Sequence, residues 1–176
     1  MKENSERQND VVYNGQHLTL LSQGGWEFVR RAKATGVVGI IALTDQQELV
    51  LVEQYRRPVS ARVLELPAGL VGDLSPETFE EAARRELLEE TGYLAESIEF
   101  LFKGPSSAGL TDEVVHILRA KGLSKTENGG GVDGEEIIVH TVPFKNLDDF
   151  THHFEKTHGM VDFKVRLASS LVKGDQ

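Results

Sequence analysis

The sequence predicts one α/β domain, a layered sandwich built around a mixed β-sheet. The chain has 176 residues, of which 39% are hydrophobic and 27% charged, a balance typical of a globular domain with a sizeable core. Apolar stretches of strand length are interrupted by a few helical patterns, an order typical of mixed α/β folds. The sequence contains no internal repeat and no linker, so we expect one globular unit.

The first 35 residues are predicted to be a β extension in front of the domain proper, which we assign to residues 36–176. Residues 11–23 (VVYNGQHLTLLSQ) and 26–32 (WEFVRRA) have strand character and predict two short strands. An extension of this length is too short to fold alone. We therefore expect it to lie against other structure, as in a dimer contact.

The first half of the domain is predicted to be strand-rich. The apolar run GVVGIIAL at residues 36–43 predicts a buried strand, and the polar turn TDQQ leads into a second strand at residues 48–59. These two strands are predicted to pair as a hairpin. Residues 62–75 (RVLELPAGLVGDLS) predict another strand, followed by a loop that glycine and proline punctuate.

A helix is predicted to follow this loop and to end before residue 92. Ser75 is a suitable N-cap, Pro76 suits the first helical position, and Glu77 suits the positive end of the helix dipole. Gly92 is a suitable stop, because glycine readily adopts the left-handed conformation that ends many helices.

The second half is predicted to contain three more strands and two helices. The strands are expected at residues 97–104, 112–123 and 136–144, and the helices at residues 147–159 and 162–174. The last two strands are separated by SKTENGGGVDGEE, residues 124–136. Three consecutive glycines in this segment predict a mobile loop.

Composition and charge exclude several classes of protein. The formal net charge is −9 at pH 7, which argues against broad binding to nucleic acid polymers or anionic membranes, and an anionic substrate would need a cation. The chain has no cysteine, which excludes disulfide and thiolate chemistry. Its polar N-terminus, MKENSERQND, and the lack of a long apolar stretch predict a soluble, cytoplasmic protein.

The predicted helix gathers acids where a helix disfavours them. In AARRELLEETGY, residues 82–93, Glu89 and Glu90 fall in the last turn, where the helix dipole is negative. At about 100° per residue, Glu86 and Glu90 share a stripe with apolar side chains. Those apolar side chains are Phe79, Ala82, Ala83 and Leu87. The charged residues that point broadly the other way are Glu81, Arg84 and Arg85.

Two interpretations of these acids are open. A charge run is usually a solvated helix face, but inward-facing carboxylates cost several kcal/mol unless they are paired or bound to a metal. Carboxylates at positions i, i+3 and i+4 lie on one side of a helix. Because hard oxygen ligands suit Mg²⁺ or Mn²⁺, a divalent cation accounts better for the three acids.

The segment from residue 69 to residue 93 resembles the Nudix box. That pattern is Gly, five residues, Glu, seven residues, then Arg-Glu-aliphatic-x-Glu-Glu-x-Gly-aliphatic. The positions that match in register are Glu77, Arg85, Glu86, Leu87, Glu89, Glu90 and Gly92. Two positions depart from it. Gly69 is separated from Glu77 by seven residues, which implies a loop two residues longer, and Tyr93 replaces the final aliphatic residue.

Three further segments resemble the ADP-ribose pyrophosphatase branch of the Nudix family. They are VEQYRRP (residues 52–58), ELPAG (residues 65–69) and SSAGLTDE (residues 106–113). The resemblance covers most of the chain and implies a Nudix α/β/α sandwich with a mixed sheet. Members of this branch hydrolyse nucleoside diphosphate sugars, and exchange of N-terminal segments within a homodimer is common among them.

The resemblance also implies the metal site. The divalent ions, Mg²⁺ or in its place Mn²⁺, would be held by Glu86, Glu89, Glu90 and the backbone carbonyl of Ala68. Arg85 would serve the catalytic site by orienting the loop through Glu77. The histidines of THHFEKTH, by contrast, are expected on an exposed helix and not as metal ligands.

Substrate contacts are implied at five positions. Arg56 would contact a phosphate or the terminal ribose, with Arg57 as its neighbour, and Glu65 and Glu113 belong to the same substrate site. Trp26 occupies the position of an aromatic that stacks on adenine. The alternatives are a surface ion pair for the arginines and core or interface packing for the tryptophan.

Glu135 matches a mobile-loop acid that is proposed as the general base in some members of the family. Glu136 is predicted to begin the next strand, with its side chain on the opposite face. Both could instead be solvated loop acids. If neither acts, Glu89 is the box carboxylate expected to take the proton.

The function implied is metal-dependent hydrolysis of ADP-ribose to AMP and ribose 5-phosphate. Another Nudix substrate remains open: a GDP- or UDP-sugar, a dinucleoside polyphosphate or a damaged nucleotide would use the same carboxylates. A non-catalytic sensor of ADP-ribose is the more distant alternative. The unbroken RELLEE argues against it, because a pure binder has no need of three costly acids.

Overall fold

The structure is a computed structural model of the chain, and it describes residues 9–73, 75–131 and 136–174. The strands are β1 (Asp10–Asn14), β2 (Leu18–Gln23), β3 (Trp26–Arg31), β4 (Gly36–Ala42), β5 (Glu48–Arg56), β6 (Ala61–Glu65), β7 (Ala68–Val71), β8 (Tyr93–Pro105), β9 (Val114–Lys125), β10 (Ile138–Pro143) and β11 (Gly159–Val161). The helices are α1 (Phe79–Thr91), α2 (Leu147–Thr157) and α3 (Phe163–Gly174), with 3-10 turns η1 (Arg57–Val59) and η2 (Phe144–Asn146).

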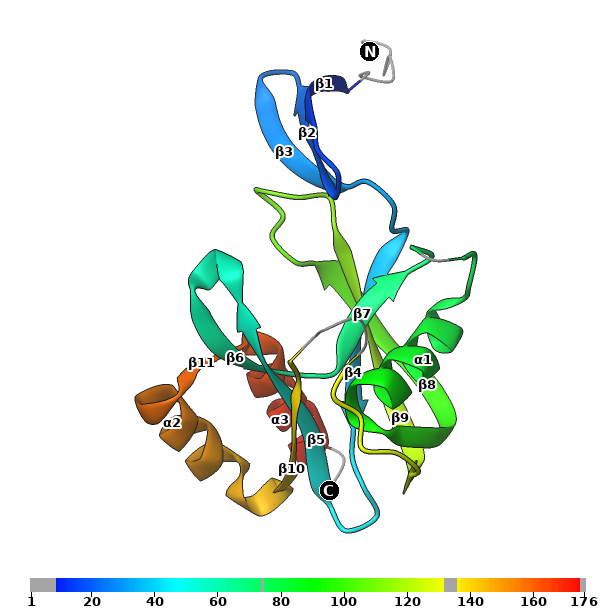
Figure 1. Ribbon diagram of the computed structural model, residues 1–176, viewed down its shortest axis with the longest axis vertical. Coiled ribbons are helices and arrows are strands. Elements are labelled where there is room, and N and C mark those ends of the chain that lie inside the picture. Colours follow the sequence, from blue (N-terminus) through cyan, green and yellow to red (C-terminus); the bar gives the residue numbers. More distant parts are fainter. Residues whose placement is uncertain (1–8, 74, 132–135, 175–176) are drawn as a thin grey trace.

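Two four-stranded sheets form the middle layer, with α1 on one side and α2 and α3 on the other (Figure 1). Their strand orders are β7-β4-β9-β8 and β10-β5-β6-β11. The pairs β4–β9 and β6–β11 are parallel, and the others are antiparallel. This mixed α/β/α sandwich confirms the predicted fold class.

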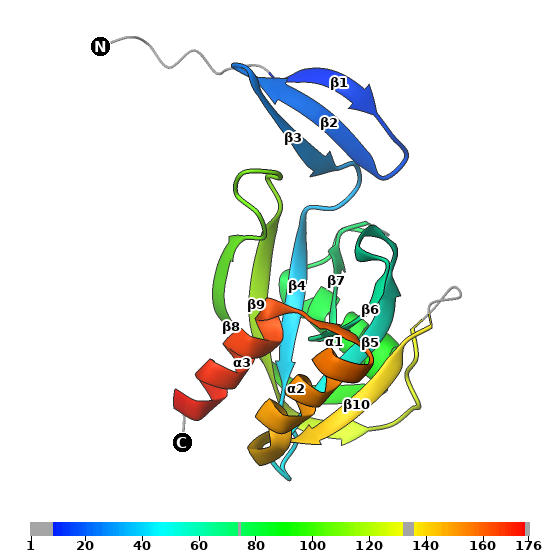
Figure 2. The same ribbon diagram turned by 90° about the vertical axis from the view of Figure 1, so that its left-hand side faces the viewer.

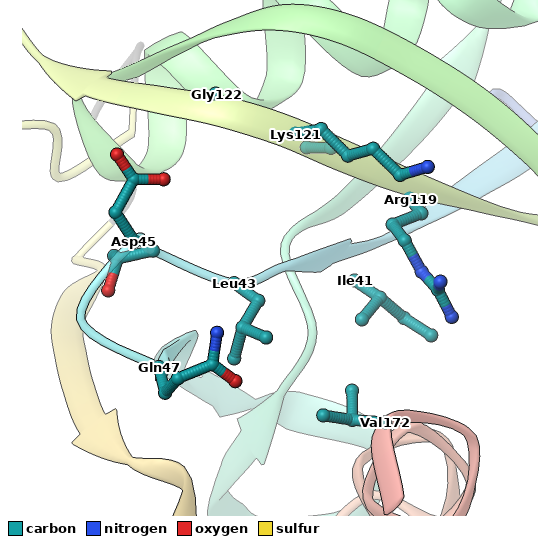
Figure 3. Close-up of a pocket in the computed structure, with 10 residues that line it drawn as sticks. Ile41, Leu43, Asp45, Gln47, Arg119, Lys121, Gly122 and Val172 are labelled. Atoms are coloured by element: carbon teal, nitrogen blue, oxygen red, sulfur yellow. The ribbon is translucent and has the colours of Figure 1, made fainter. Parts of the chain in front are cut away.

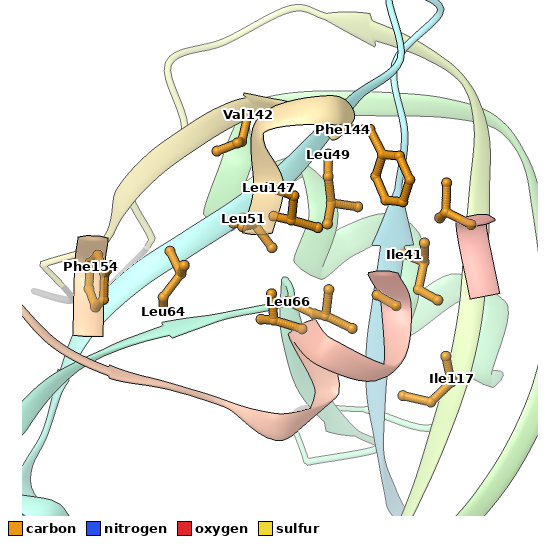
Figure 4. Packing of buried hydrophobic residues seen from close by; sticks show 13 residues of the cluster. Ile41, Leu49, Leu51, Leu64, Leu66, Ile117, Val142, Phe144, Leu147 and Phe154 are labelled. Carbon is orange, nitrogen blue, oxygen red and sulfur yellow. The ribbon is translucent and has the colours of Figure 1, made fainter. Parts of the chain in front are cut away.

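Hydrophobic cores fill both sides of the middle layer. One core joins both sheets to α2 and α3, and Leu49, Leu51 and Leu64 are fully buried in it (Figure 4). The other joins the sheets to α1 through Ala82, Ala83 and Leu87. Alternate residues of β5 serve the two cores, since Leu49 and Leu51 belong to the first and Val50 to the second.

The predicted β4–β5 hairpin is wrong as a strand pairing. The two strands belong to different sheets, and an isolated bridge between Leu43 and Leu49 joins them at the turn. The reason is that β4 already pairs with β7 along one edge and with β9 along the other, so neither edge of β4 is left for β5.

The N-terminal extension contains three strands where the sequence predicted two. Residues 11–23 are divided by a turn in which the Gly15 amide donates to the Leu18 carbonyl at 2.9 Å, and β1-β2-β3 form a separate sheet. Figure 2 shows this sheet standing away from the main body. It meets the loop before β9: the Val29 amide donates to the Leu110 carbonyl, and Arg30 pairs with Asp112 at 2.6 Å.

In the second half one strand was missed and several boundaries differ from prediction; β8, for example, begins at Tyr93, where residue 97 was predicted. β11 was not predicted, because three residues are too few to show a strand pattern; it pairs in parallel with β6. β10 begins at Ile138, so Glu136 precedes the strand and is exposed. No helix in the described part of the chain is long and apolar enough to cross a membrane.

Candidate functional site

Helix α1 starts later than predicted, so Glu77 lies before the helix, where its side chain pairs with Arg85. Thr78, not Ser75, is the N-cap: its side chain accepts from the Glu81 amide while Glu81 accepts from the Thr78 amide at 2.7 Å. This reciprocal capping box satisfies two backbone amides, which a cap at Ser75 would not. Pro76 and Glu77 therefore precede the helix. Its predicted end is confirmed, with Gly92 in the left-handed region at φ +74°.

Two carboxylates of α1 lie against the backbone of β7. Gly69 has no side chain, and a Cβ built on it would collide with the Glu86 carboxylate. Glu90 is only 5% exposed, and its Oε2 accepts from the Ala68 amide at 3.0 Å. The small residues Ala68 and Gly69 thus let the acids of α1 approach the strand.

Arg85 lies among the acids, although the helical wheel placed it on the solvated face. Its side chain is 24% exposed, and Nη1 donates to Glu86 at 2.8 Å and to Glu89 at 3.2 Å. Nη2 donates to Glu77 at 2.8 Å and to the Leu70 carbonyl at 3.1 Å. The wheel failed here because a long guanidinium can curl around the helix to its neighbours at i+1 and i+4.

The pKa values of this cluster reflect burial and pairing. Burial raises the pKa of Glu86 to about 7, and this outweighs the opposing effect of Arg85; Glu89 and Asp73 raise it further. Hydrogen bonds from Arg85 lower the pKa of Glu77, and the same pairing raises the pKa of Arg85. A carboxyl with a pKa near neutrality is a group for which a nearby cation would relieve the cost of ionisation.

The acids do not surround a common point in this structure. Within residues 9–73, 75–131 and 136–174, no three His, Asp or Glu side chains form a group that could hold a metal ion. The guanidinium of Arg85 takes up the space between Glu86 and Glu89.

Two observations nevertheless fit a divalent cation here. Glu86 lies against Gly69 and has a raised pKa, and Asp73 Oδ1 is buried and has no hydrogen-bond partner among the residues that the structure describes. Buried carboxylate oxygens of this kind suit Mg²⁺ and Mn²⁺, because both ions prefer hard oxygen ligands. Asp73 was not among the predicted site residues. The signal that could have identified it is the loop two residues longer than the Nudix pattern, in which it lies.

Of the predicted substrate residues, Arg56 and Arg57 lie where β5 turns toward β6, and Glu65 lies at the far end of β6, opposite Val52. Arg56 Nε donates to Glu65 Oε2 at 2.7 Å, and Glu65 is buried while Arg56 is largely exposed. Arg57 is exposed at the start of η1. Arg56 and Glu65 therefore form a half-buried ion pair whose cation faces solvent.

Trp26 belongs to the N-terminal sheet, and Glu113 lies where that sheet meets the body. Trp26 is 62% exposed at the start of β3, so it is not a core residue of this chain. Glu113 accepts from Arg31 at 2.5 Å and lines a cavity of about 220 Å³ between β3 and β9. The structure does not bring Trp26 to the acids of α1 within one chain.

The glycine-rich segment has two parts in the structure. Glu135 lies outside the described residues. The three glycines at residues 129–131 are described. They do not form a free linker but run along the C-terminal end of α1, and their φ values are positive, from 70° to 115°. The histidines of α2, His152 and His153, are exposed as predicted.

A cavity of about 410 Å³ lies apart from these residues, between the β4–β5 turn, β9 and α3 (Figure 3). It is lined by Asp45, Gln47, Arg119 and Lys121 together with apolar side chains, and Lys121 is paired with Glu99 at 2.7 Å. None of the predicted site residues that the structure describes lines it, so it is separate from them.

Three of the proteins to which the chain is similar are described first. The chain is 44% identical over 103 residues to the methanol dehydrogenase activator of Bacillus methanolicus, covering 58% of this chain and 55% of that protein. It is 36% identical over 106 residues to the ADP-ribose pyrophosphatase of Bacillus subtilis, covering 60% and 56%. It is 38% identical over 104 residues to the GDP-mannose pyrophosphatase of Pectobacterium atrosepticum, covering 54% and 52%. The chain thus matches about half the length of each relative.

A solved structure and a family model complete the comparison. The crystal structure of an ADP compounds hydrolase has the same fold, with a TM-score of 0.70, 21% sequence identity, and coverage of 99% of this chain and 96% of that one. The NUDIX domain model matches residues 33–163, which include both four-stranded sheets, α1 and the whole carboxylate cluster. This chain therefore belongs to the Nudix family.

Proposed function

We propose that the chain hydrolyses the pyrophosphate bond of ADP-ribose or a related nucleoside diphosphate sugar, releasing a nucleoside monophosphate and a sugar phosphate. The observation that carries the proposal is the carboxylate-bearing helix α1, seated against the backbone of Ala68 and Gly69. Relatives named ADP-ribose pyrophosphatase and GDP-mannose pyrophosphatase support this substrate class.

The metal site we propose uses oxygen ligands from α1 and β7. Its ligands would be Glu86, Glu89, Glu90 and the carbonyl of Ala68, and its ion Mg²⁺, with Mn²⁺ as a substitute. Such ions, when bound, neutralise a diphosphate and make water a better nucleophile. Arg85 is assigned a structural role in this site. Its Nη2 donates to Glu77 and to the Leu70 carbonyl and so holds the loop before α1; these bonds are separate from those that its Nη1 makes to Glu86 and Glu89.

Substrate recognition is assigned to the positively charged and aromatic positions. Arg56 binds a phosphate or the terminal ribose, and the buried Glu65 holds its guanidinium in place. Arg57 assists from η1, and Glu113 contributes from the loop before β9. In a protein of net charge −9, exposed arginines of this kind supply the local attraction that a diphosphate needs.

We further propose a cytoplasmic homodimer in which Trp26 stacks on the base of a substrate bound to the partner subunit. Trp26 is exposed on a small sheet that stands away from its own body, and the β1-β2-β3 sheet exposes several other large apolar side chains. Those side chains are Val11, Val12, Tyr13 and Leu18. An apolar surface of this kind is expected to be covered in an assembly.

Removal of the proton from the attacking water is assigned to Glu135. This assignment rests on the resemblance alone, and Glu89 is the alternative. General-base removal by a carboxylate requires that it lie within hydrogen-bond reach of the water. Glu89 is 29% exposed, so it is open to solvent at the edge of the cluster.

The proposed activity is tested with a hydrolysis panel in the presence of Mg²⁺. The panel contains ADP-ribose, GDP-mannose, a UDP-sugar, a dinucleoside polyphosphate and an oxidised nucleoside triphosphate. We expect a nucleoside monophosphate from the sugar nucleotides, with ADP-ribose preferred. Reaction in ¹⁸O-labelled water then identifies the phosphorus attacked. Binding of ADP-ribose without any product would overturn the proposal in favour of a sensor.

The variant Glu90→Gln tests the site within that assay. Glutamine keeps an oxygen for the Ala68 amide but removes a charge from the cluster, so turnover should fall by orders of magnitude while the fold survives. Metal-free stability should be unchanged or raised, because like-charge repulsion is lost. Turnover near that of the wild type would exclude Glu90 as a ligand.

A further inference from the structure

The C-terminal end of α1 presents an electrostatic problem. Glu89 and Glu90 occupy its last turn, and no basic residue lies there. The carbonyls of a helix C-terminus carry partial negative charge, so two acids at this position are unfavourable and the turn is prone to fray. Something other than a basic side chain must hold this turn.

The segment of residues 126–131 supplies that support through its backbone. The Gly130 amide donates to the Glu90 carbonyl at 2.9 Å, and the Gly131 amide donates to the Glu89 carbonyl at 3.1 Å. The Thr126 amide donates to the Gly92 carbonyl at 2.9 Å. The carbonyls of the two acidic residues therefore receive hydrogen bonds from a segment distant in sequence.

Glycine is required for this close contact. A Cβ on Gly129 would lie 2.7 Å from the Glu90 carbonyl oxygen, and one on Gly92 would lie 2.9 Å from the Gly129 amide. Gly130 differs from both: among the described residues a Cβ on it would meet no atom closer than 3.8 Å, but its φ of +115° is a conformation that other residues rarely adopt.

We propose that Gly130 and Gly131 position Glu89 and Glu90 for metal binding, by donating backbone hydrogen bonds to the carbonyls of those same two residues, while Gly129 allows the close approach. The inference rests on the proposed metal-dependent function. The amides offset the negative helix terminus, and they fix the turn from which both carboxylates project. The Ile137 amide bonds to the Gly130 carbonyl at 3.4 Å, so the segment is also anchored next to β10.

Gly130 provides the sharpest test, because a Cβ there clashes with none of the described residues, so that a substitution acts through the backbone conformation. We would compare Gly130→Val, which strongly disfavours positive φ, with Gly130→Asn, which tolerates it better. Gly25→Val is the matched control: Gly25 has a φ of +84° and open space, and it lies in the β2–β3 turn.

Binding of Mn²⁺ alone, measured by electron paramagnetic resonance, is the main readout, and amide exchange at residues 89–91 and 130–131 is the second. We expect Gly130→Val to raise the Mn²⁺ Kd about tenfold or more and to speed that exchange, with Gly130→Asn between it and the wild type. Gly25→Val should lower thermal stability without moving the Kd.

The outcomes separate two failures. If wild type binds Mn²⁺ and both Gly130 variants bind it equally well, the positioning role is wrong while the proposed function stands. If wild type does not bind Mn²⁺, the metal site itself is wrong, and the positioning role fails with it. Should Gly130→Val not fold, the Gly130→Asn Kd decides on its own.

Discussion

The backbone of Gly69 and the carboxylate of Glu86 are in direct contact, with no room for a side chain between them. This contact couples the ELPAG segment to the acidic helix, although the two residues lie in different elements, β7 and α1. It also explains why Gly69 is required at this position for steric reasons, since its φ does not lie in the left-handed region.

Gly69→Ala should therefore damage the site more than the fold. The added methyl must displace Glu86 from the strand, at a cost of about 1 to 3 kcal/mol in unfolding free energy, and turnover should fall at least tenfold. Urea unfolding and a Mg²⁺-dependent hydrolysis assay measure the two effects. Gly104→Ala is the control, because a Cβ there meets nothing within 4 Å. Equal turnover in both variants would contradict a role for the contact.

A buried charge cluster on the α2 side of the sheet predicts a pH dependence of stability. The Glu53 side chain is 5% exposed and pairs with Arg62, and with His140 at 2.8 Å. Burial alone would raise the pKa of Glu53, but the hydrogen bonds from His140 and Arg62 outweigh it and lower the pKa below the ordinary 4.5. The ionised carboxylate is thus more favourable in the folded than in the unfolded state.

The direction of the pH dependence of stability follows from the lowered pKa of Glu53. Because the folded pKa is the lower one, Glu53 stabilises the fold above about pH 4.5, and that contribution is lost as the pH falls further. Glu53→Gln should cost about 3 kcal/mol at pH 7, and the difference from wild type should shrink in acid. Urea unfolding between pH 7 and pH 3 measures both. A difference that stays constant with pH would rule out this ion pair as the cause.

Trp26→Ala tests the proposed exchange between subunits. Loss of a base stack should weaken ADP-ribose binding by about 1 to 3 kcal/mol, seen as a rise in KM with little change in kcat. Phe163→Ala is a matched control, since Phe163 is an aromatic side chain of similar exposure that lies in α3, outside the β1-β2-β3 sheet. Light scattering that gives a monomer at micromolar concentration would refute the dimer. Equal weakening of ADP-ribose and GDP-mannose would mean stacking without base selection.

Substitution can show which of the two adjacent acids, Glu135 or Glu136, acts as the general base. Glu135→Gln should lower turnover by about 10² to 10⁴, the usual scale for loss of a general base, with little change in substrate affinity. Glu136→Gln should be mild, because Glu136 is exposed in the segment before β10. The reverse order would assign the role to Glu136, and two mild variants would assign it to Glu89.

The parts of the fold that local pattern specifies were predictable. The strand at residues 36–42 follows from an unbroken apolar run, and the end of α1 follows from Gly92. Glu86 and Glu90 were singled out because they stand on an apolar stripe, and Glu89 because it lies in the last turn, where the helix dipole is negative. These features depend on residues close together in the chain.

Other features depend on contacts that a single sequence does not display. Arg85 was misplaced because a wheel records where a side chain leaves the helix, not where its guanidinium ends. Three consecutive glycines suggested a mobile loop, yet the amides of Gly130 and Gly131 donate hydrogen bonds to a helix end some forty residues earlier. The β4–β5 pairing failed because the occupation of both edges of β4 is a property of the whole sheet.

The parallel pairing of β4 with β9 also bears on how the molecule folds. Val37 pairs with Val115 and Ala42 with Ala120, so the intervening chain, including all of α1, must close as one long loop before these strands meet. Non-local parallel pairing of this kind is slow. The capping box of Thr78 and Glu81 is a purely local contact, so α1 can form early. The packing of α1 against β7 and the central sheet, by contrast, is completed only after β9 has been synthesised.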